Sequence, residues 1–223
     1  SKEQKEYVIK EKIKKLNEEL GITSSKDDEI SSLKGRIDEF KAPDRVKNKL
    51  ISELERYKYT PASSPEVSMI RTYIETLLSL PYECASAEET SKDKIRKELD
   101  KTHYGLEEVK TRITDYAILK KNNPNLENPI ICLVGAPGIG KTSIARTIAN
   151  ALKREFMKIS LGGLNDSSEL IGHRRTYLGA APGKIISSII KCGTNNPVIL
   201  LDEVDKLVKD YKGDPASVLL DIL

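Results

Sequence analysis

The chain has 223 residues, of which 38% are hydrophobic and 32% are charged, and its formal net charge is +3. This composition is typical of a soluble protein of one or two domains. The sequence has no apolar run of the ~18 residues that a membrane span needs, and none of its first residues resemble a signal peptide. Because positive and negative charges are interspersed, the sequence implies no strong positive field for binding nucleic acid. The three cysteines lack metal-ligand spacing, which indicates reduced thiols in a cytosolic compartment. The chain has only two histidines, which argues against a histidine-rich metal site.

Residues 1–60 carry three narrow apolar stripes at helical spacing. The stripes are Ile9, Ile13, Leu16 and Leu20, then Ile30, Leu33, Ile37 and Phe40, then Val46, Leu50, Leu54 and Tyr57. Gly21 is typical of the end of a helix, and residues 25–28 have the pattern of a capping box at the start of the next one. Pro43 is typical of the first turn of a helix. Because the other faces are rich in Lys and Glu, the pattern predicts a helical arm or an antiparallel coiled coil, and a small solvated bundle fits it equally well.

A turn-rich break at 59–65 separates this arm from a helical linker region, which we assign to residues 61–101. The linker is predicted to hold helices at about 65–80 and 91–100. The third region, residues 102–223, begins with a predicted helix at about 106–121, whose apolar face carries Leu106, Val109, Ile113 and Tyr116.

Residues 135–142 read Gly-Ala-Pro-Gly-Ile-Gly-Lys-Thr, a full match to the P-loop of nucleoside triphosphate-binding proteins. The loop follows an apolar run, Ile130–Val134, that predicts a buried strand, and it precedes a helical pattern at 143–152. Backbone amides at a helix N-terminus suit phosphate, Lys141 would reach the β- and γ-phosphates, and the Thr142 hydroxyl would ligate Mg²⁺. The predicted nucleotide-binding set is Gly135, Ala136, Pro137, Gly138, Ile139, Gly140, Lys141, Thr142, Ser143 and, beyond the loop, Asp202.

A second apolar run, Val198–Leu201, predicts another buried strand that ends in two adjacent carboxylates. Asp202 suits a Mg²⁺ ion held partly through water, and Glu203 suits the general base that activates the attacking water. Asp202 comes 61 residues after Lys141, which leaves room for an intervening strand at Phe156–Ser160. Charged pairs often only end a strand, but behind a P-loop this pair favours ATP hydrolysis.

Several segments together resemble one family, the ATP-dependent Lon proteases, whose motor belongs to the AAA+ class. The resemblance covers essentially the whole chain. It departs from the usual family pattern at Thr102, where an acidic residue is common, and at Ala136, where proline is common. Besides the P-loop and the carboxylate pair, its anchors are Ser1–Tyr7, His103–Leu106, Ser160–Gly163, Gly172–Gly179, Pro182–Lys184 and Gly213–Ser217.

The resemblance implies an α/β fold: an incomplete P-loop AAA+ parallel sheet with flanking helices, preceded by an all-α region. The strands that flank the P-loop strand, the sensor residue, the arginine finger and the Ser-Lys peptidase domain are expected beyond Leu223, so the segment alone is expected to be inactive. The full-length protein would be a homohexamer in the bacterial cytoplasm, or alternatively the mitochondrial matrix. It would use ATP and Mg²⁺ to unfold and degrade misfolded or regulatory proteins.

The resemblance also implies roles for two short stretches. Tyr104 and Gly105 would lie beside the adenine, and Tyr177 and Leu178 would sit on a loop that grips protein substrate in the ring's pore. Read without the family, these are ordinary surface and loop residues. The basic run at 173–175 is compatible with DNA contact, although such runs are more often solvated or paired with acids.

Two other classes of protein fit parts of the sequence. A non-proteolytic AAA+ remodelling ATPase would share the motor, and the sequence past Leu223 would distinguish it by lacking a peptidase domain. A coiled-coil scaffold with a degenerate nucleotide switch would lack part of the catalytic set, whereas Lys141, Thr142, Asp202 and Glu203 are all present.

Overall fold

The computed structural model describes residues 8, 9, 12, 16, 26–89, 91–123, 130–164, 166, 168–174, 180–207 and 215–223. Its contacts divide the chain into two compact units, residues 1–79 and 80–223. The domain boundaries predicted at residues 60 and 101 stay predictions. Within the described part of the chain, no helix is both long and apolar enough to cross a membrane.

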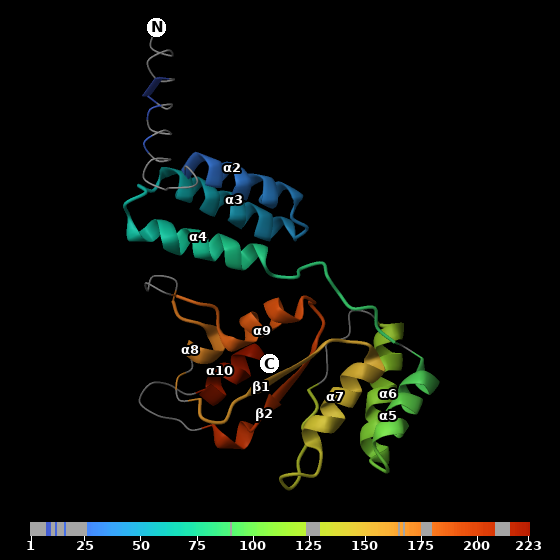
Figure 1. Ribbon diagram of the computed structural model, residues 1–223. Coiled ribbons are helices and arrows are strands. Elements are labelled where there is room, and N and C mark those ends of the chain that lie inside the picture. Colours follow the sequence, from blue (N-terminus) through green and yellow to red (C-terminus); the bar gives the residue numbers. More distant parts are fainter. Residues whose placement is uncertain are drawn as a thin grey trace. The chain divides into compact units, whose positions relative to one another are not determined.

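Within residues 26–79, the first unit contains the helices α2 (Lys26–Glu39), α3 (Asp44–Tyr59) and α4 (Pro65–Leu78) (Figure 1). Ser64 caps α4 by accepting a hydrogen bond from the Glu66 N–H, and Pro65 occupies the first helical position, where its missing N–H costs nothing. The helices share one apolar core, so this unit extends past residue 60. The core consists of Leu33, Ile37, Leu50, Leu54, Tyr57, Ile70 and Ile74.

The apolar stripes predicted at 30–40 and 46–57 are therefore confirmed as the buried faces of α2 and α3. Ile9 and Leu16, from the first stripe, are helical and exposed. Ile13 and Leu20 lie outside the described residues.

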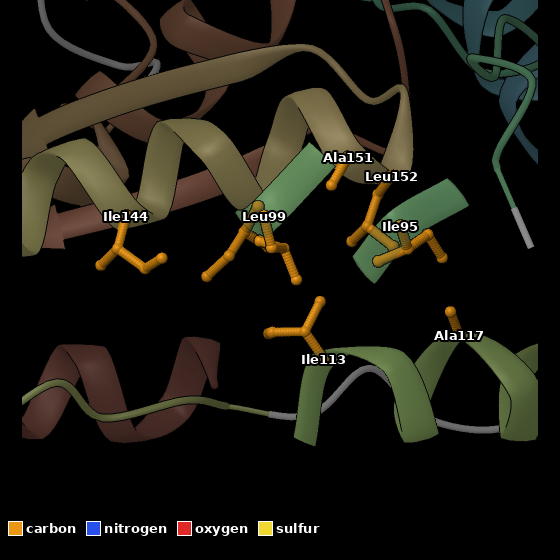
Figure 2. Packing of buried hydrophobic residues seen from close by; sticks show 8 residues of the cluster. Ile95, Leu99, Ile113, Ala117, Ile144, Ala151 and Leu152 are labelled. Atoms are coloured by element: carbon orange, nitrogen blue, oxygen red, sulfur yellow. The ribbon is translucent and has the colours of Figure 1, made fainter. Parts of the chain in front are cut away.

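In the second unit, α5 (Lys92–Thr102), α6 (Glu107–Asn122) and α7 (Lys141–Leu152) pack around one apolar cluster (Figure 2). All three helices begin and end within two residues of the predicted positions. Ile144 and Ile148 bring α7 into the cluster, so packing fixes the helix that follows the P-loop. The cluster consists of Ile95, Leu99, Ile113, Ala117, Ile144, Ile148, Ala151 and Leu152.

Among the described residues, two parallel strands, β1 (Phe156–Ser160) and β2 (Val198–Asp202), form the sheet, and both lie where the sequence predicts a strand. Phe156 lies opposite Val198, and Ser160 lies opposite Asp202. Side chains of β1 alternate, with Met157 and Ile159 buried and Lys158 and Ser160 exposed. The buried face packs against α8 (Ser168–Ile171), α9 (Lys184–Cys192) and α10 (Pro215–Ile222). Strand β2 was predicted to be buried, but its side chains are only half-buried or exposed.

The apolar run Ile130–Val134 is not a strand, and the prediction for it is wrong in this structure. Ile130 is 67% exposed and Val134 is 90% exposed, while Leu133 packs against the α5–α7 cluster. A strand requires a neighbour that satisfies its backbone hydrogen bonds, and among the described residues the sheet consists of β1 and β2 alone.

Residues 82–89, which we call the strap, are tied to the start of β2 and the end of α7. The Ser86 N–H donates to Asn196 Oδ1 (2.7 Å), and Asn196 Nδ2 donates back to the Ser86 carbonyl (3.0 Å). The Glu89 N–H donates to the carbonyl of Leu152 (3.0 Å), the last residue of α7. Asn195 adds two more bonds, to the carbonyls of Tyr82 and Cys84.

Candidate functional site

The P-loop ends at the N-terminus of α7, as predicted. Gly138 and Gly140 have φ angles of +80° and +93°, a left-handed conformation that side-chain-bearing residues rarely adopt. Gly140 is the N-cap, and the helix begins at Lys141. The first amides of a helix have no partner within it, so this turn presents unpaired N–H groups where an anion can bind.

The side chain of Lys141 folds back over the loop. Its ammonium donates hydrogen bonds to the carbonyls of Gly135 and Ala136, each at 2.7 Å. It has to leave these carbonyls to contact a phosphate, and the exposed loop leaves it free to do so.

The sheet brings Asp202 to the first turn of α7. Thr142 Oγ1 donates to Asp202 Oδ2 at 3.5 Å, although the two residues are 60 positions apart. Lys158 Nζ lies 2.7 Å from the same Asp202 oxygen. The hydrogen bond from Lys158 is the main cause that holds the pKa of Asp202 below its ordinary value, so the carboxylate is ionised at neutral pH.

A hydroxyl next to a carboxylate is a donor set that suits Mg²⁺, which prefers oxygen ligands. Within the described ranges, no group of three or more His, Cys, Asp or Glu side chains could hold a metal. Mg²⁺ commonly uses one or two protein oxygens and takes its other ligands from phosphates and water, so Thr142 and Asp202 are enough to serve as its protein ligands.

Glu203 leaves β2 in a left-handed conformation, with φ of +61°. For a residue with a side chain this conformation costs about 1 kcal/mol, and such strain is concentrated at functional sites. Its carboxylate pairs with Lys206 and accepts a hydrogen bond from Ser160 Oγ at 3.1 Å. Lys206 is the main cause of the lowered pKa of Glu203, which keeps the carboxylate ionised, as a general base must be.

The stretch His103–Leu106 is held by a buried lysine. Lys110 is 2% exposed, and its ammonium contacts Asp100 Oδ1 (2.6 Å) and the carbonyl of His103 (2.7 Å). Gly105 and Leu106 both have left-handed backbone angles, and Tyr104 is fully exposed.

Thr102 connects this stretch to α7. Its hydroxyl donates to Thr147 Oγ1 at 3.2 Å and lies 2.9 Å from His103 Nδ1.

Sequence reasoning missed four side chains of this site: Lys110, Lys158, Ser160 and Lys206. The sequence carries a pattern that could have indicated three of them, and none for Lys110. Lys206 follows Glu203 by one turn, and Lys158 and Ser160 alternate with the apolar residues of the predicted strand.

Tyr177, Leu178 and Arg175 lie outside the described residues, and His173 and Arg174 are exposed. Gly172 and Pro182 form an antiparallel bridge, so the residues just before 173 and just after 181 lie next to each other.

Known proteins resemble the chain along almost all of its length. The family of ATPases associated with various cellular activities (AAA) matches residues 131–223. A Lon protease from Brevibacillus choshinensis is 47% identical over 220 residues, which are 99% of this chain and 28% of that protein. Lon protease 1 of Bacillus subtilis is 46% identical over 99% of this chain and 28% of its own length. The Lon protease of Mycoplasma genitalium is 43% identical over the whole chain and 28% of its own length. The chain thus spans little more than a quarter of these curated relatives.

Proposed function

The chain belongs to the Lon protease family and includes its AAA ATPase region, and from this premise we propose that it is the motor segment of an ATP-dependent protease. One observation carries the proposal: Thr142, on the first turn of the P-loop helix, meets Asp202 at the end of β2, with Glu203 beside it. That contact brings together the two halves of an ATP site that lie 60 residues apart in sequence.

Each residue has a distinct role in this proposal. The unpaired amides at the start of α7 orient the phosphates, and Lys141 exchanges its carbonyl partners for the β- and γ-phosphates. Thr142 and Asp202 would hold Mg²⁺, which supplies charge neutralisation of the phosphates. Glu203 takes the proton of the attacking water. Tyr104 and Gly105 would lie beside the adenine, a role supported by the exposed tyrosine on a backbone that Lys110 holds in place.

Two substitutions in the full-length protein test the ATP site. We expect Lys141→Ala to lower nucleotide affinity more than tenfold, because Lys141 contacts phosphate in both ground and transition states. We expect Glu203→Gln to retain affinity and to slow hydrolysis about 10²- to 10⁴-fold, because the base acts only when water attacks. Binding is measured with a fluorescent ATP analogue and hydrolysis by phosphate release. Hydrolysis by Glu203→Gln at the wild-type rate would remove Glu203 from the base role.

The names and organisms of the relatives support a proposal for what the motor segment does in the full-length protein. They are named Lon protease, which favours a proteolytic enzyme over a remodelling ATPase, and they come from bacteria, which favours the bacterial cytoplasm. We propose a homohexamer that unfolds protein substrates, with Tyr177 and Leu178 as the gripping residues. An aromatic side chain suits this task, because it offers a large apolar face and has few rotamers to immobilise.

Tyr177→Ala tests the gripping role. In the full-length protein we expect it to leave ATP hydrolysis and cleavage of short unfolded peptides largely intact and to abolish degradation of a stably folded protein. Degradation of the folded substrate at the normal rate per ATP hydrolysed would return Tyr177 to an ordinary loop tyrosine. DNA contact by His173, Arg174 and Arg175 remains a weaker proposal, because only their charge supports it.

A further inference from the structure

Each carboxylate of the Asp202–Glu203 pair is held by a lysine of the chain itself. Lys158 pairs with Asp202 and Lys206 pairs with Glu203. The Asp202 oxygen that faces Lys158 is Oδ2, which also accepts the Thr142 hydroxyl. Lys158 therefore occupies the oxygen that the proposed metal site would use.

The sheet register explains how Lys158 reaches this oxygen. Ser160 lies opposite Asp202, and Lys158 precedes Ser160 by two residues on the same exposed face of β1. Two residues of a strand span about 6.6 Å, which is close to the reach of an extended lysine side chain. The Lys158 side chain is 43% exposed, so its ammonium can move into water without becoming a buried, unpaired charge.

We propose that Lys158 is a stand-in cation: it neutralises Asp202 before Mg²⁺ binds, and it has to withdraw from Oδ2 before Mg²⁺ can use that carboxylate. Lys158 thus competes with Mg²⁺ and raises the Mg²⁺ concentration that nucleotide binding needs. This inference rests on the proposed assignment of Thr142 and Asp202 to the metal.

Competition predicts a signature that a phosphate-binding lysine would not give. With Lys158 removed, Asp202 is left as an uncompensated negative charge, which attracts Mg²⁺ but repels the phosphates of metal-free nucleotide. A lysine that contacts phosphate would, when removed, weaken binding both with and without Mg²⁺. A purely structural lysine would leave the Mg²⁺ midpoint unchanged.

The experiment titrates Mg²⁺ into the full-length protein in the presence of a fluorescent, non-hydrolysable ATP analogue. For Lys158→Met we expect a two- to fivefold lower Mg²⁺ midpoint, about what a partly exposed ion pair is worth, together with weaker analogue binding in EDTA. Lys158→Arg keeps the charge and should stay near wild type. Lys94→Met is the matched control: it removes one lysine from a different exposed pair, with Glu89. An unchanged or higher midpoint in Lys158→Met would overturn the stand-in role.

Asp202→Asn separates this inference from the function on which it rests. If the metal assignment is right, Asp202→Asn raises the Mg²⁺ midpoint, and adding Lys158→Met to it shifts the midpoint no further. If the Mg²⁺ midpoint of Asp202→Asn equals that of the wild type, the metal assignment fails and the inference fails with it. If Asp202→Asn behaves as expected and Lys158→Met alone does not lower the midpoint, only the stand-in role fails.

Discussion

The carboxylate of Glu203 lies against the backbone of Gly162, so closely that a Cβ atom on residue 162 would stand 3.0 Å from Glu203 Cδ. Gly162 follows β1 by two residues, and Ser160 at the end of that strand donates to the same carboxylate. The absence of a side chain at residue 162 is therefore what allows Glu203 to rest on the end of β1.

Gly162→Ala should displace the Glu203 carboxylate without unfolding the chain, because the conflict falls mainly on the far end of a flexible side chain. We expect nucleotide affinity within about twofold of wild type and hydrolysis slowed about tenfold, since small misplacements of a catalytic group are costly. Phosphate release and analogue binding measure the two effects in the full-length protein. Gly35→Ala in α2, where an added Cβ meets nothing within 4 Å, is the matched control. Normal hydrolysis by Gly162→Ala would show that this position of Glu203 is irrelevant to catalysis.

Asn196→Ala should loosen the strap. The amide of Asn196 both accepts from and donates to the backbone of Ser86, and each such bond contributes about 1 kcal/mol. Hydrogen exchange of peptides covering residues 82–89 should therefore be about five- to tenfold faster in the variant, as read by mass spectrometry of the full-length protein. Asn150→Ala, on the exposed face of α7, should leave the strap unchanged. Unaltered exchange in Asn196→Ala would mean that the hydrogen bonds of Asn195 and Glu89 hold the strap in place without Asn196.

The strap should also open in acid. The pKa of Glu89 is lowered to about 2, first by the hydrogen bond from the Ser91 N–H and then by Lys153 and Lys94. Because this pKa is below the ordinary 4.5, the ionised carboxylate stabilises the folded strap fully above pH 4.5, and the stabilisation is lost as pH falls from 4.5 towards 2. Exchange of Ser91 and its neighbours, corrected for intrinsic rates, should accelerate over that range in wild type and not in Glu89→Gln. Equal acceleration in both would assign the acid effect to other groups.

The sequence predicts the local features of this site well. The P-loop, both strands of the sheet and the helices α5, α6 and α7 depend on residues that are neighbours in sequence, so spacing and apolar periodicity are enough to find them. The carboxylate pair could be recognised because a P-loop precedes it.

The rest depends on pairing between distant segments. Lys158 meets Asp202 because β1 and β2 pair in one particular register, which a single sequence does not specify. The run Ile130–Val134 has the composition of a strand, but composition cannot supply the neighbour that a strand requires. The left-handed backbone of Glu203 also has no local signal, since glycine is the residue that usually adopts it.

The strap and the carboxylate pair lie at opposite ends of β2. Just before the start of β2, Asn195 and Asn196 form hydrogen bonds with residues of the strap. Asp202 lies at the other end of β2, six residues and about 20 Å from Asn196. Hydrogen bonds from the two asparagines therefore join the strap to the residues that lead directly into β2. Its far end is the carboxylate pair. A shift of β2 along its axis would therefore move the strap contacts at one end and Asp202 at the other.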